Sequence, residues 1–535
     1  MATTATEPVD SLTAPADTDT SIIQLDKAQD PLSWSPSKKW LCTIVIVAMT
    51  TTISFCSSIH TAVLADVAHT FRCSRTVATL GVSTFLLGFA AGPLIFGPLS
   101  EVWGRNPIYR AVLLFFVVFN VGCALAPNIA SLLIFRFFCG FFGSPTVTNS
   151  GGSLTDMWPT SHRTVPLALF TAASFLGPVV APIVGGFVVQ YTNWRWNYWI
   201  VSILGGVSYT AMLAILPETY APVILQRKSQ KDRLPDIDYY VTLTRPWVML
   251  FTEPILFLLS LYMAFCYGIL YLDFTAYPIV FAQTRGWAPG PAGLSFLGIG
   301  LGMALATACS PLINRIHAHY VTKLRLRRRR RRRRQNPLQH GNNSPSPSPS
   351  PSPSPPSSPL GPPEPAPEPE ARLPHLIPLS PLLPLSLFWF AWTCSSPSSS
   401  ALVPIASGVP FGFGFVPLFL AITAYLTDVY GGGPGPSSGG PGPGPGTGSH
   451  AASALAANAV LRSLFGAAAP LFATRMYDRL GPAWATSVLG FAAVGLAGLP
   501  WGFWRWGGWL RGRSGFVVAR EAAAERGRRG EGEGV

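Results

Sequence analysis

The sequence has few charged residues, because Asp, Glu, Lys and Arg together make up only 12% of its 535 residues. Soluble globular proteins carry about 25%. The chain also lacks a Gly-x-x-x-x-Gly-Lys-Ser/Thr loop, which argues against ATP as the source of energy. None of its eight cysteines has the spacing of a metal site. These absences argue against an enzyme, so we predict no catalytic residues, no metal ligands and no cofactor.

The sequence is instead rich in long apolar runs. Hydrophobic residues make up 49% of the chain, and the mean hydropathy is +0.34. A run of about 20 apolar residues can cross the hydrocarbon core of a bilayer. Twelve such runs lie at residues 39–64, 77–96, 108–126, 130–151, 165–189, 196–216, 248–271, 290–313, 376–393, 401–426, 451–472 and 483–504. The sequence therefore predicts an all-α membrane protein with 12 transmembrane helices in two groups of six.

The net charge of +14 comes mainly from a run of arginines at residues 327–334. Basic residues gather in the cytoplasmic loops of membrane proteins. The loops on one side of the predicted spans carry most of the Lys and Arg even without this run. We therefore predict that both termini are cytoplasmic and that the partner is a lipid bilayer rather than a nucleic acid.

Changes in composition divide the chain into tails, bundles and loops. The predicted parts are an N-terminal tail (1–38), a six-helix bundle (39–216), a central cytoplasmic loop (217–245), a second bundle (246–513) and a C-terminal tail (514–535). The tail at 1–38 has no apolar signal region, so the first span is expected to direct its own insertion. Inserts at 317–370 and 431–450 are so rich in Ser, Pro, Gly and Arg that we predict disorder.

The inserts leave several interpretations open. The arginine run could hold anionic lipids of the inner leaflet, and the Ser-Pro repeat at 344–355 could accept phosphate. The alternative is a tolerated loop expansion, or translated non-coding sequence.

Two predicted spans carry small residues at every fourth position. On a helix this spacing forms a line along one face, and small residues allow helix backbones to approach closely within a bilayer. The two stripes lie in opposite bundles, so the sequence predicts that they press the bundles together. Their members are Gly177, Ala181 and Gly185 in one span, and Gly298, Gly302, Ala306 and Ser310 in the other.

A polar motif with two charged residues follows the second span. It contains Gly97, Glu101, Gly104 and Arg105. Glycine permits a tight turn, and the two charged residues can bind the ends of facing helices. The motif resembles the loop signature of the major facilitator superfamily, except at Val102 and Asn106. The resemblance implies a lock on the cytoplasmic side of a transporter that opens to each side in turn.

Two further segments resemble signatures of the same superfamily. Residues 133–140 resemble its fourth-helix signature, which implies a role for Arg136 in proton coupling; the alternative is an arginine that reaches the outer interface. Residues 177–186 resemble the fifth-helix signature of its antiporters, whose helix packs against the eighth. The matching residues of this antiporter motif are Gly177, Pro178, Pro182, Gly185 and Gly186.

Shorter matches at 30–40, 151–158, 193–196, 217–228 and 458–466 together resemble the fungal drug:proton antiporters with 12 spans, which include polyamine and azole exporters. The resemblance implies a monomeric carrier in the plasma membrane that exchanges protons for drugs, polyamines or secondary metabolites, and so confers multidrug resistance. The alternatives are a nutrient uptake carrier of the same superfamily, and a non-transporting member or misassembled gene product.

In the fold that this resemblance implies, the first and fourth helices of each bundle line a central substrate site. Aromatic side chains there suit planar, amphipathic or cationic compounds. Asp273 is expected at the outer end of the seventh span, either as a proton carrier or as a solvated carboxylate. The predicted cavity residues are Ser57, Asn149, Tyr262, Tyr267, Tyr271, Trp389 and Tyr425.

Overall fold

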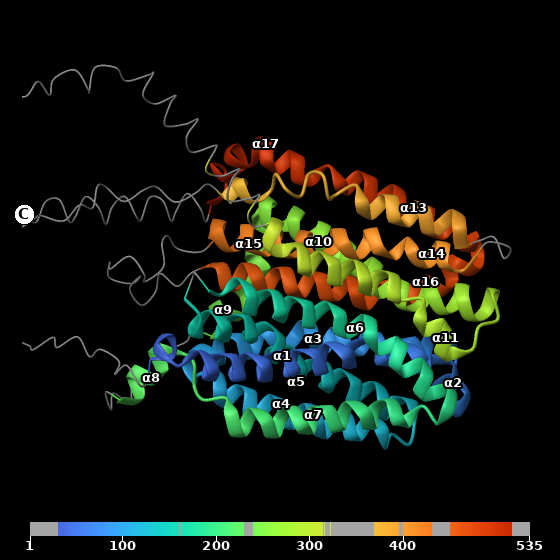
Figure 1. Cartoon of the computed structure of the whole chain (residues 1–535), viewed down its shortest axis with the longest axis horizontal. Helices are drawn as coiled ribbons and strands as arrows, with labels where there is room; N and C mark the ends of the chain where they lie inside the picture. The colour runs from blue at the N-terminus through green and yellow to red at the C-terminus, as the bar shows by residue number, and fades with distance from the viewer. Residues whose placement is uncertain are drawn as a thin grey trace, which may run out of the picture.

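Helices make up nearly all of the computed structural model (Figure 1), which describes residues 30–159, 162–228, 239–313, 315, 322, 369–394, 400–430 and 450–515. Ten helices in these ranges are long and apolar enough to cross a bilayer. The stretch Ala451–Arg511 bends at Gly481, whose φ is 72°, and so contains two spans. The shorter apolar helix α13 (Leu382–Cys394) provides one more. The described residues thus hold 12 crossing segments, which confirms the predicted fold class.

The first six spans form one bundle, at the bottom of Figure 1. Its helices are α1 (Pro36–Ile59), α2 (Leu64–Thr70), α3 (Arg75–Val102), α4 (Arg105–Ala124), α5 (Ile129–Met157), α6 (Thr164–Tyr191) and α7 (Arg195–Ile215). The 3-10 turn η2 (His60–Val63) joins α1 to α2, and another, η1 (Pro31–Ser33), precedes α1. Within the bundle, α3 packs along α5, and α1 packs against α6 and α7.

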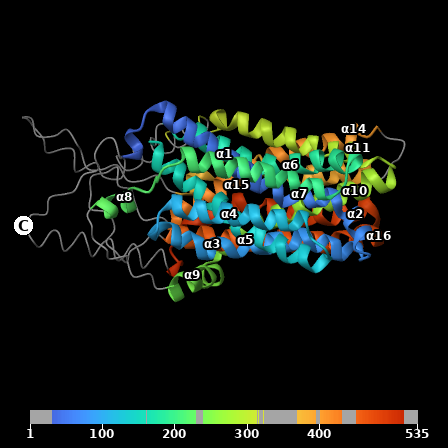
Figure 2. The ribbon, with the colours of Figure 1, turned by 90° about the horizontal axis from the view of Figure 1, so that it is seen from below.

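The remaining spans form the second bundle, at the top of Figure 1. Its elements are α10 (Pro254–Pro278), the π-helical turn η3 (Ile279–Thr284), α11 (Pro289–Leu294), which begins the span Pro289–Ile313, η5 (Pro369–Arg372), α13, α14 (Leu402–Ala406), α15 (Gly408–Tyr430), α16 (His450–Ala497) and α17 (Leu499–Arg511). Two short helices, α8 (Ala221–Lys228) and α9 (Tyr239–Thr252), lie at one end of the bundles, on the left in Figures 1 and 2.

Prolines move two spans from their predicted positions. The seventh was predicted at 248–271, but α9 ends at Thr252 and α10 begins at Pro254, because proline disfavours helical backbone in the residue before it. This span therefore continues to Thr284. The ninth was predicted from residue 376, but α13 begins at Leu382, after Pro378 and Pro381, which lack the N–H that a helix interior needs.

The predicted inserts fall mostly outside the described residues. The ends of both inserts are exceptions, because Pro369 and Glu370 belong to η5 and His450 begins α16. At the end of the first insert, η5 contacts the last helix. There the Glu370 carboxylate accepts a charged contact from Arg511 Nε of α17 at 2.7 Å.

The first stripe of small residues lies against its own bundle. A Cβ atom placed on Gly177 would lie 2.9 Å from Cβ of Ser54, and one placed on Gly185 would lie 2.9 Å from Cβ of Ala62. Ser54 belongs to α1 and Ala62 to η2, which follows it. These glycines therefore let α6 approach α1.

The second stripe also closes a contact within one bundle. A Cβ on Gly298 would overlap the carbonyl oxygen of Ile405 in α14, and a Cβ on Gly302 would overlap that of Val409 in α15. The prediction that the two stripes press the bundles together is therefore wrong. Spacing identifies a close-packed helix face, but it does not identify the helix that covers that face.

The fifth and eighth spans do meet, through other residues. A Cβ on Gly186 of α6 would overlap the carbonyl oxygen of Pro289 in α11. In the other direction, a Cβ on Gly293 would lie 2.7 Å from the carbonyl oxygen of Pro182. Helix α3 also packs against α16. The most extensive contacts between the bundles are thus those of two helix pairs, α6–α11 and α3–α16.

Candidate functional site

A cavity of about 810 Å³ lies between the two bundles. Its inner walls come from both of them, with Ser57 of α1 and Asn149 of α5 on one side, and Tyr267 and Tyr271 of α10 on the other. Glu101, Arg105, Gln226 and Arg245 also line it. Gln226 belongs to α8, so the cavity extends from the interior to the end of the bundles that α8 and α9 mark.

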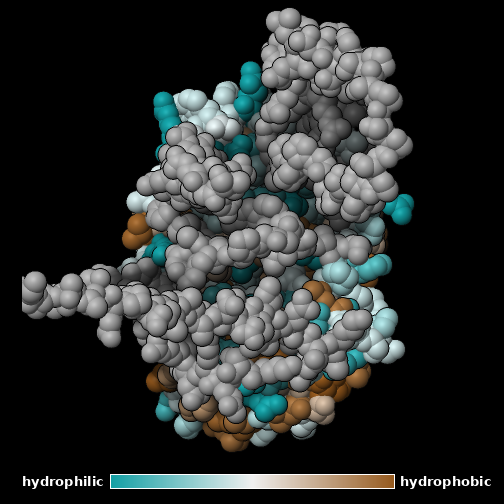
Figure 3. Space-filling model, turned by 90° about the vertical axis from the view of Figure 1, so that its left-hand side faces the viewer, coloured by the Kyte–Doolittle hydropathy of each residue, from teal (hydrophilic) through white to brown (hydrophobic). Residues whose placement is uncertain are grey.

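Contacts between the bundles close the opposite end. The hydroxyl of Ser83 in α3 donates to the carbonyl oxygen of Ala467 in α16 at 2.7 Å. The backbone N–H of Gly290 donates to Oε1 of Gln190 at 3.0 Å, beside the α6–α11 contact. The cavity is therefore open toward the end that carries α8 and α9. This end faces the viewer in Figure 3, where the coloured side chains include hydrophilic ones and, along the lower edge, hydrophobic ones.

The loop after α3 is held by a carboxylate from outside the predicted motif. Gly104 has a φ of 96°, a backbone conformation that favours glycine. Backbone N–H groups of Arg105 and Asn106 donate to Oε1 and Oε2 of Glu218 at 2.9 and 3.1 Å. Because the N-terminus of a helix has unpaired N–H groups and partial positive charge, Glu218 acts as the cap of α4.

Arg105 joins this loop to the neighbouring helix. Its Nε lies 3.7 Å from Oδ2 of Asp156 near the end of α5, and its Nη1 donates to the hydroxyl of Ser100 at 2.9 Å. Its guanidinium also lies 5.1 Å from the ring centre of Tyr220. Glu101 and Gly97 line the cavity beside it. All four predicted motif residues therefore lie at the open end.

Arg136 is completely buried inside the first bundle. Its Nε donates to the carbonyl oxygen of Gly81 at 3.0 Å, and its Nη1 donates to that of Cys56 at 2.9 Å. The Nη2 donates to the carbonyl oxygen of Ser57 at 3.3 Å, and the ring centre of Phe85 lies 4.6 Å from the guanidinium. This side chain points to the interior, not to the outer interface. It thus supports the cavity wall at Ser57 from behind.

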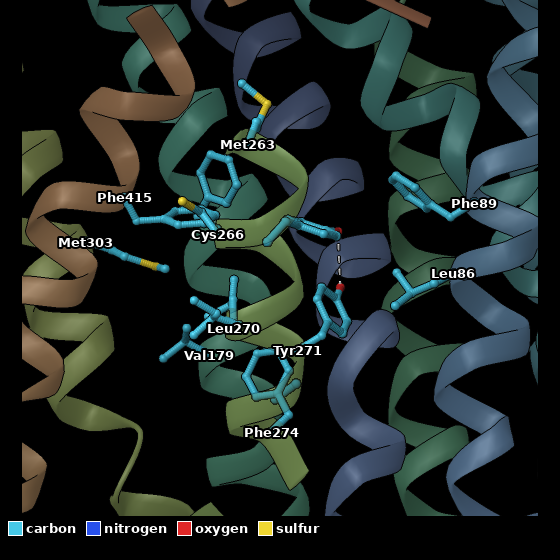
Figure 4. Packing of buried hydrophobic residues seen from close by; sticks show 14 of the residues in the cluster. Leu86, Phe89, Val179, Met263, Cys266, Leu270, Tyr271, Phe274, Met303 and Phe415 are labelled. Carbon is cyan, nitrogen blue, oxygen red and sulfur yellow. Dashed lines mark hydrogen bonds between the residues drawn. The ribbon is translucent and has the colours of Figure 1, made fainter. Parts of the chain in front are cut away.

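A row of hydrogen-bonded hydroxyl groups connects the bundles at the closed end of the cavity. The hydroxyl of Tyr267 donates to that of Tyr271 at 3.4 Å, which Figure 4 shows as a dashed line at Tyr271. Tyr271 donates to Oγ of Ser57 at 2.7 Å, and Ser57 donates to the carbonyl oxygen of Ser54 at 2.6 Å. Three of the predicted cavity residues are thus directly connected.

The other predicted residues are dispersed. Tyr262 is buried against Leu376 and Leu383 in a separate small void. Trp389 is 41% exposed on the outside of α13, and Tyr425 is buried next to α17. Asp273 lies within α10, well before the end of its span at Thr284, and is only 4% exposed. It does not line the cavity, and its position is not that of a solvated vestibule carboxylate.

Pro178 and Pro182 of the antiporter motif interrupt the hydrogen bonding of α6. Because Pro182 has no N–H, the carbonyl oxygen of Pro178 loses its partner within the helix. The hydroxyl of Ser58 in α1 donates to that oxygen at 2.5 Å. A neighbouring helix thus satisfies the freed carbonyl group, as membrane helices with proline require.

Some cavity residues were missing from the predicted site. Arg462 and Asn458 of α16 line it together with Phe175 of α6 and Phe419 of α15. The rings of the two phenylalanines lie 4.6 Å apart. In the sequence, the segment 458–466 contributed to the family resemblance but was not assigned to the cavity. No local sequence pattern indicates that this face of α16 lines the cavity. Among the described residues, no group of three or more His, Cys, Asp or Glu side chains could hold a metal ion.

Two helical bundles, joined by contacts at one end and enclosing a cavity that reaches the other, define a membrane transporter of the alternating-access class. The sequence comparisons give the family. Residues 45–333 match the family model described as Major Facilitator Superfamily. The chain belongs to this superfamily.

Two fungal transporters align with most of the chain. The MFS-type efflux pump MFS2 of Trichophyton rubrum is 38% identical over 92% of this chain and 76% of its own length. The multidrug transporter mdrA of Aspergillus fumigatus is 38% identical over 92% of this chain and 75% of its own. The crystal structure of the human organic anion transporter MFSD10 (TETRAN) superposes with a TM-score of 0.51 at 16% identity, over 88% of this chain and all of that one.

Proposed function

We propose that this protein exports small organic compounds, such as drugs, polyamines or secondary metabolites, in exchange for protons. The observation that carries the proposal is the cavity between the bundles. Helices of both bundles line this cavity, and it opens at only one end of the bundles. Its hydroxyl, amide and aromatic groups suit amphipathic organic molecules. The names of the two fungal relatives, an efflux pump and a multidrug transporter, support export.

The same proposal assigns a place and an orientation. The protein would lie in the plasma membrane as a monomer with both termini in the cytoplasm, and residues 39–216 and 246–513 would form the moving bundles. The end that carries Arg105 and Glu218 would then face the cytoplasm, so the described conformation is open inward. Compounds enter the cavity from the cytoplasm, and separation of the α6–α11 and α3–α16 contacts releases them outside.

Proton coupling would involve Asp273 and Arg136. An ionisable side chain buried in a membrane span is expensive and is a functional candidate by default. Asp273 is buried in α10, two residues from Tyr271, which donates to Ser57. Arg136 donates to the carbonyl group of the same Ser57. A change of protonation or position at Asp273 or Arg136 can therefore alter the contacts of Ser57 in the cavity wall.

A transport assay in vesicles tests this function. Purified protein is reconstituted in proteoliposomes, and uptake of rhodamine 6G, a cation, and fluorescein, an anion, is measured with the vesicle interior acid, neutral or alkaline. In the fraction inserted with the cytoplasmic end outward, we expect at least one dye to accumulate when the interior is acid. Movement of neither dye under any gradient would contradict export.

The variant Asp273→Asn should abolish acid-driven accumulation while the dye still stabilises the purified protein against heat. Asp66→Asn, at a carboxylate in α2 outside the cavity, is the matched control and should transport normally. Unchanged transport by Asp273→Asn would remove Asp273 from the coupling mechanism. Accumulation that requires an alkaline interior in the same vesicles would instead favour an uptake carrier.

A further inference from the structure

Arg462 is a buried cation in the wall of the transport cavity. It lies in α16, 8% exposed, and lines the cavity together with Asn458 one turn earlier. Its position 12 residues after His450 places it about 18 Å along the helix, near the middle of a bilayer core about 30 Å thick. Arg462 therefore carries its charge at the depth where a substrate would bind.

No carboxylate neutralises this arginine within the described residues. Its guanidinium lies 4.9 Å from the ring centres of both Tyr267 and Phe419, and its Nε has no hydrogen-bond partner. Two other arginines have partners that Arg462 lacks. The Nε of Arg105 also has no hydrogen bond, but it lies 3.7 Å from the Asp156 carboxylate, and Arg136 binds three carbonyl groups. Arg462 thus differs in having aromatic faces as its neighbours.

A buried charge without a counter-ion is unfavourable, because desolvation costs several kcal/mol and contact with aromatic rings returns only about 2 kcal/mol. Two amide atoms at the cavity are also unsatisfied, namely Nδ2 of Asn149 on the facing helix α5 and Oδ1 of Asn458, one turn from Arg462. Arg462 and the Asn149 amide nitrogen are hydrogen-bond donors, whereas Asn458 Oδ1 is an acceptor. The cavity wall therefore offers donors and positive charge that the protein itself leaves unused.

The geometry points to an organic anion as the substrate, with its carboxylate or similar group bound by Arg462. This inference rests on the proposed function and names the class of compound that the cavity takes. The apolar part of the substrate packs against Leu86, Phe89 and the Phe175–Phe419 pair. A planar anion suits this place, because guanidinium binds a carboxylate through two parallel hydrogen bonds.

The remaining charges of the cavity favour the same sign of substrate. Arg105 and Arg245 line its open end together with one carboxylate, Glu101. Among the described residues, three positive side chains and one negative side chain thus line the cavity, and one of the three, Arg105, is paired with Asp156. A cationic compound that moved inward would meet Arg462 with no acidic residue beside it, whereas an anion would gain attraction along the path.

Binding to matched compounds tests the inference. The probes are benzoate, 1-naphthylacetate and 1-pyrenebutyrate, each compared with its neutral primary amide at pH 7.4. Affinities are derived from thermal stabilisation of the purified full-length protein, since a ligand of the folded state raises its stability. We expect at least one carboxylate to bind at least 10-fold more tightly than its amide.

Substitutions then locate the charge. Arg462→Gln should weaken binding of that carboxylate about 10- to 100-fold, the loss expected for one charge-assisted hydrogen bond or two, and should leave amide binding unchanged. Arg462→Lys, which keeps the charge, should retain a preference for the anion. Arg110→Gln removes the same charge from an exposed position on α4 and should bind like the native protein.

Three results would overturn the inference. They are a native protein that prefers no carboxylate over its amide, an Arg462→Gln variant with undiminished preference, and an equal loss in Arg110→Gln. If Arg462→Gln fails to fold, the preference of the native protein and of Arg462→Lys still decides the matter. The vesicle assay separates this inference from the proposed function, because export of rhodamine 6G without any binding of anions would refute only the inference.

Discussion

The contact between α6 and α11 should control which end of the cavity is open. A Cβ on Gly293 would lie 2.7 Å from the carbonyl oxygen of Pro182 and 3.0 Å from Cα of Ile183. Both are backbone atoms of the other bundle and cannot rotate away. Ordinary contact begins at 3.4 Å, so Gly293→Ala requires the bundles to separate by several tenths of an ångström at this end.

Overpacking of this kind costs about 1–3 kcal/mol, which corresponds to a change of about 5- to 150-fold in the ratio of two conformations. The cost applies only while this end is closed. We therefore expect Gly293→Ala to shift the population toward a conformation that is open at the α6–α11 end.

Spin labels can measure this shift. Cysteines introduced at Thr192 and Ala288, both exposed at the ends of the two spans, report the distance between the bundles by double electron–electron resonance. Cys73 and Cys309, the partly exposed native cysteines, are replaced by serine. Gly293→Ala should increase the fraction of long distances.

The control is Gly495→Ala, also within the second bundle, where a Cβ would meet nothing within 4 Å. Both variants exchange glycine for alanine in a helix and share any gain in helix propensity. If both give the same distance distribution as the native protein, the closed contact does not govern opening.

Two further predictions concern stability. Glu218→Ala removes both acceptors that cap α4 and should lower the free energy of unfolding, measured in denaturant titrations, by about 0.5–2 kcal/mol. Glu218→Gln should lower this free energy by less. Equal stability of the native protein and both variants would contradict the capping role. Ser58→Ala leaves the Pro178 carbonyl unsatisfied and should cost about 1–3 kcal/mol, whereas Ser202→Ala, which removes a bond to the carbonyl oxygen of its own helix, should cost less. Equal losses would show that the freed carbonyl group does not need Ser58.

The sequence predicted the fold well because the bilayer imposes strong rules on it. Twelve apolar runs became 12 crossing segments, since a chain in lipid must satisfy its backbone hydrogen bonds within helices. Local errors arose where proline decided the boundary, as at Pro254. The two stripes predicted close packing correctly but not its partners, because periodicity describes a single helix and pairing depends on the whole arrangement.

The cavity was only partly predictable for the same reason. Ser57, Asn149, Tyr267 and Tyr271 line it, whereas Trp389 lies on the outside of α13. Arg462 was not among the predicted residues, because an arginine inside an apolar run does not reveal whether it faces a carboxylate, lipid or a cavity. Glu218 caps α4 from more than 100 positions away in sequence, and nothing in the loop motif itself indicates this partner.

The central claim is that the cavity opens to one side of the membrane at a time. Ala459 is a small residue of its wall, so the variant Ala459→Cys can be labelled there with a membrane-impermeant maleimide, in vesicles of each orientation. At rest, it should react only from the side that carries Glu101 and Arg105. During turnover of a transported dye under a pH gradient, it should also become reactive from the opposite side. Reactivity that never changes side under turnover would contradict alternating access.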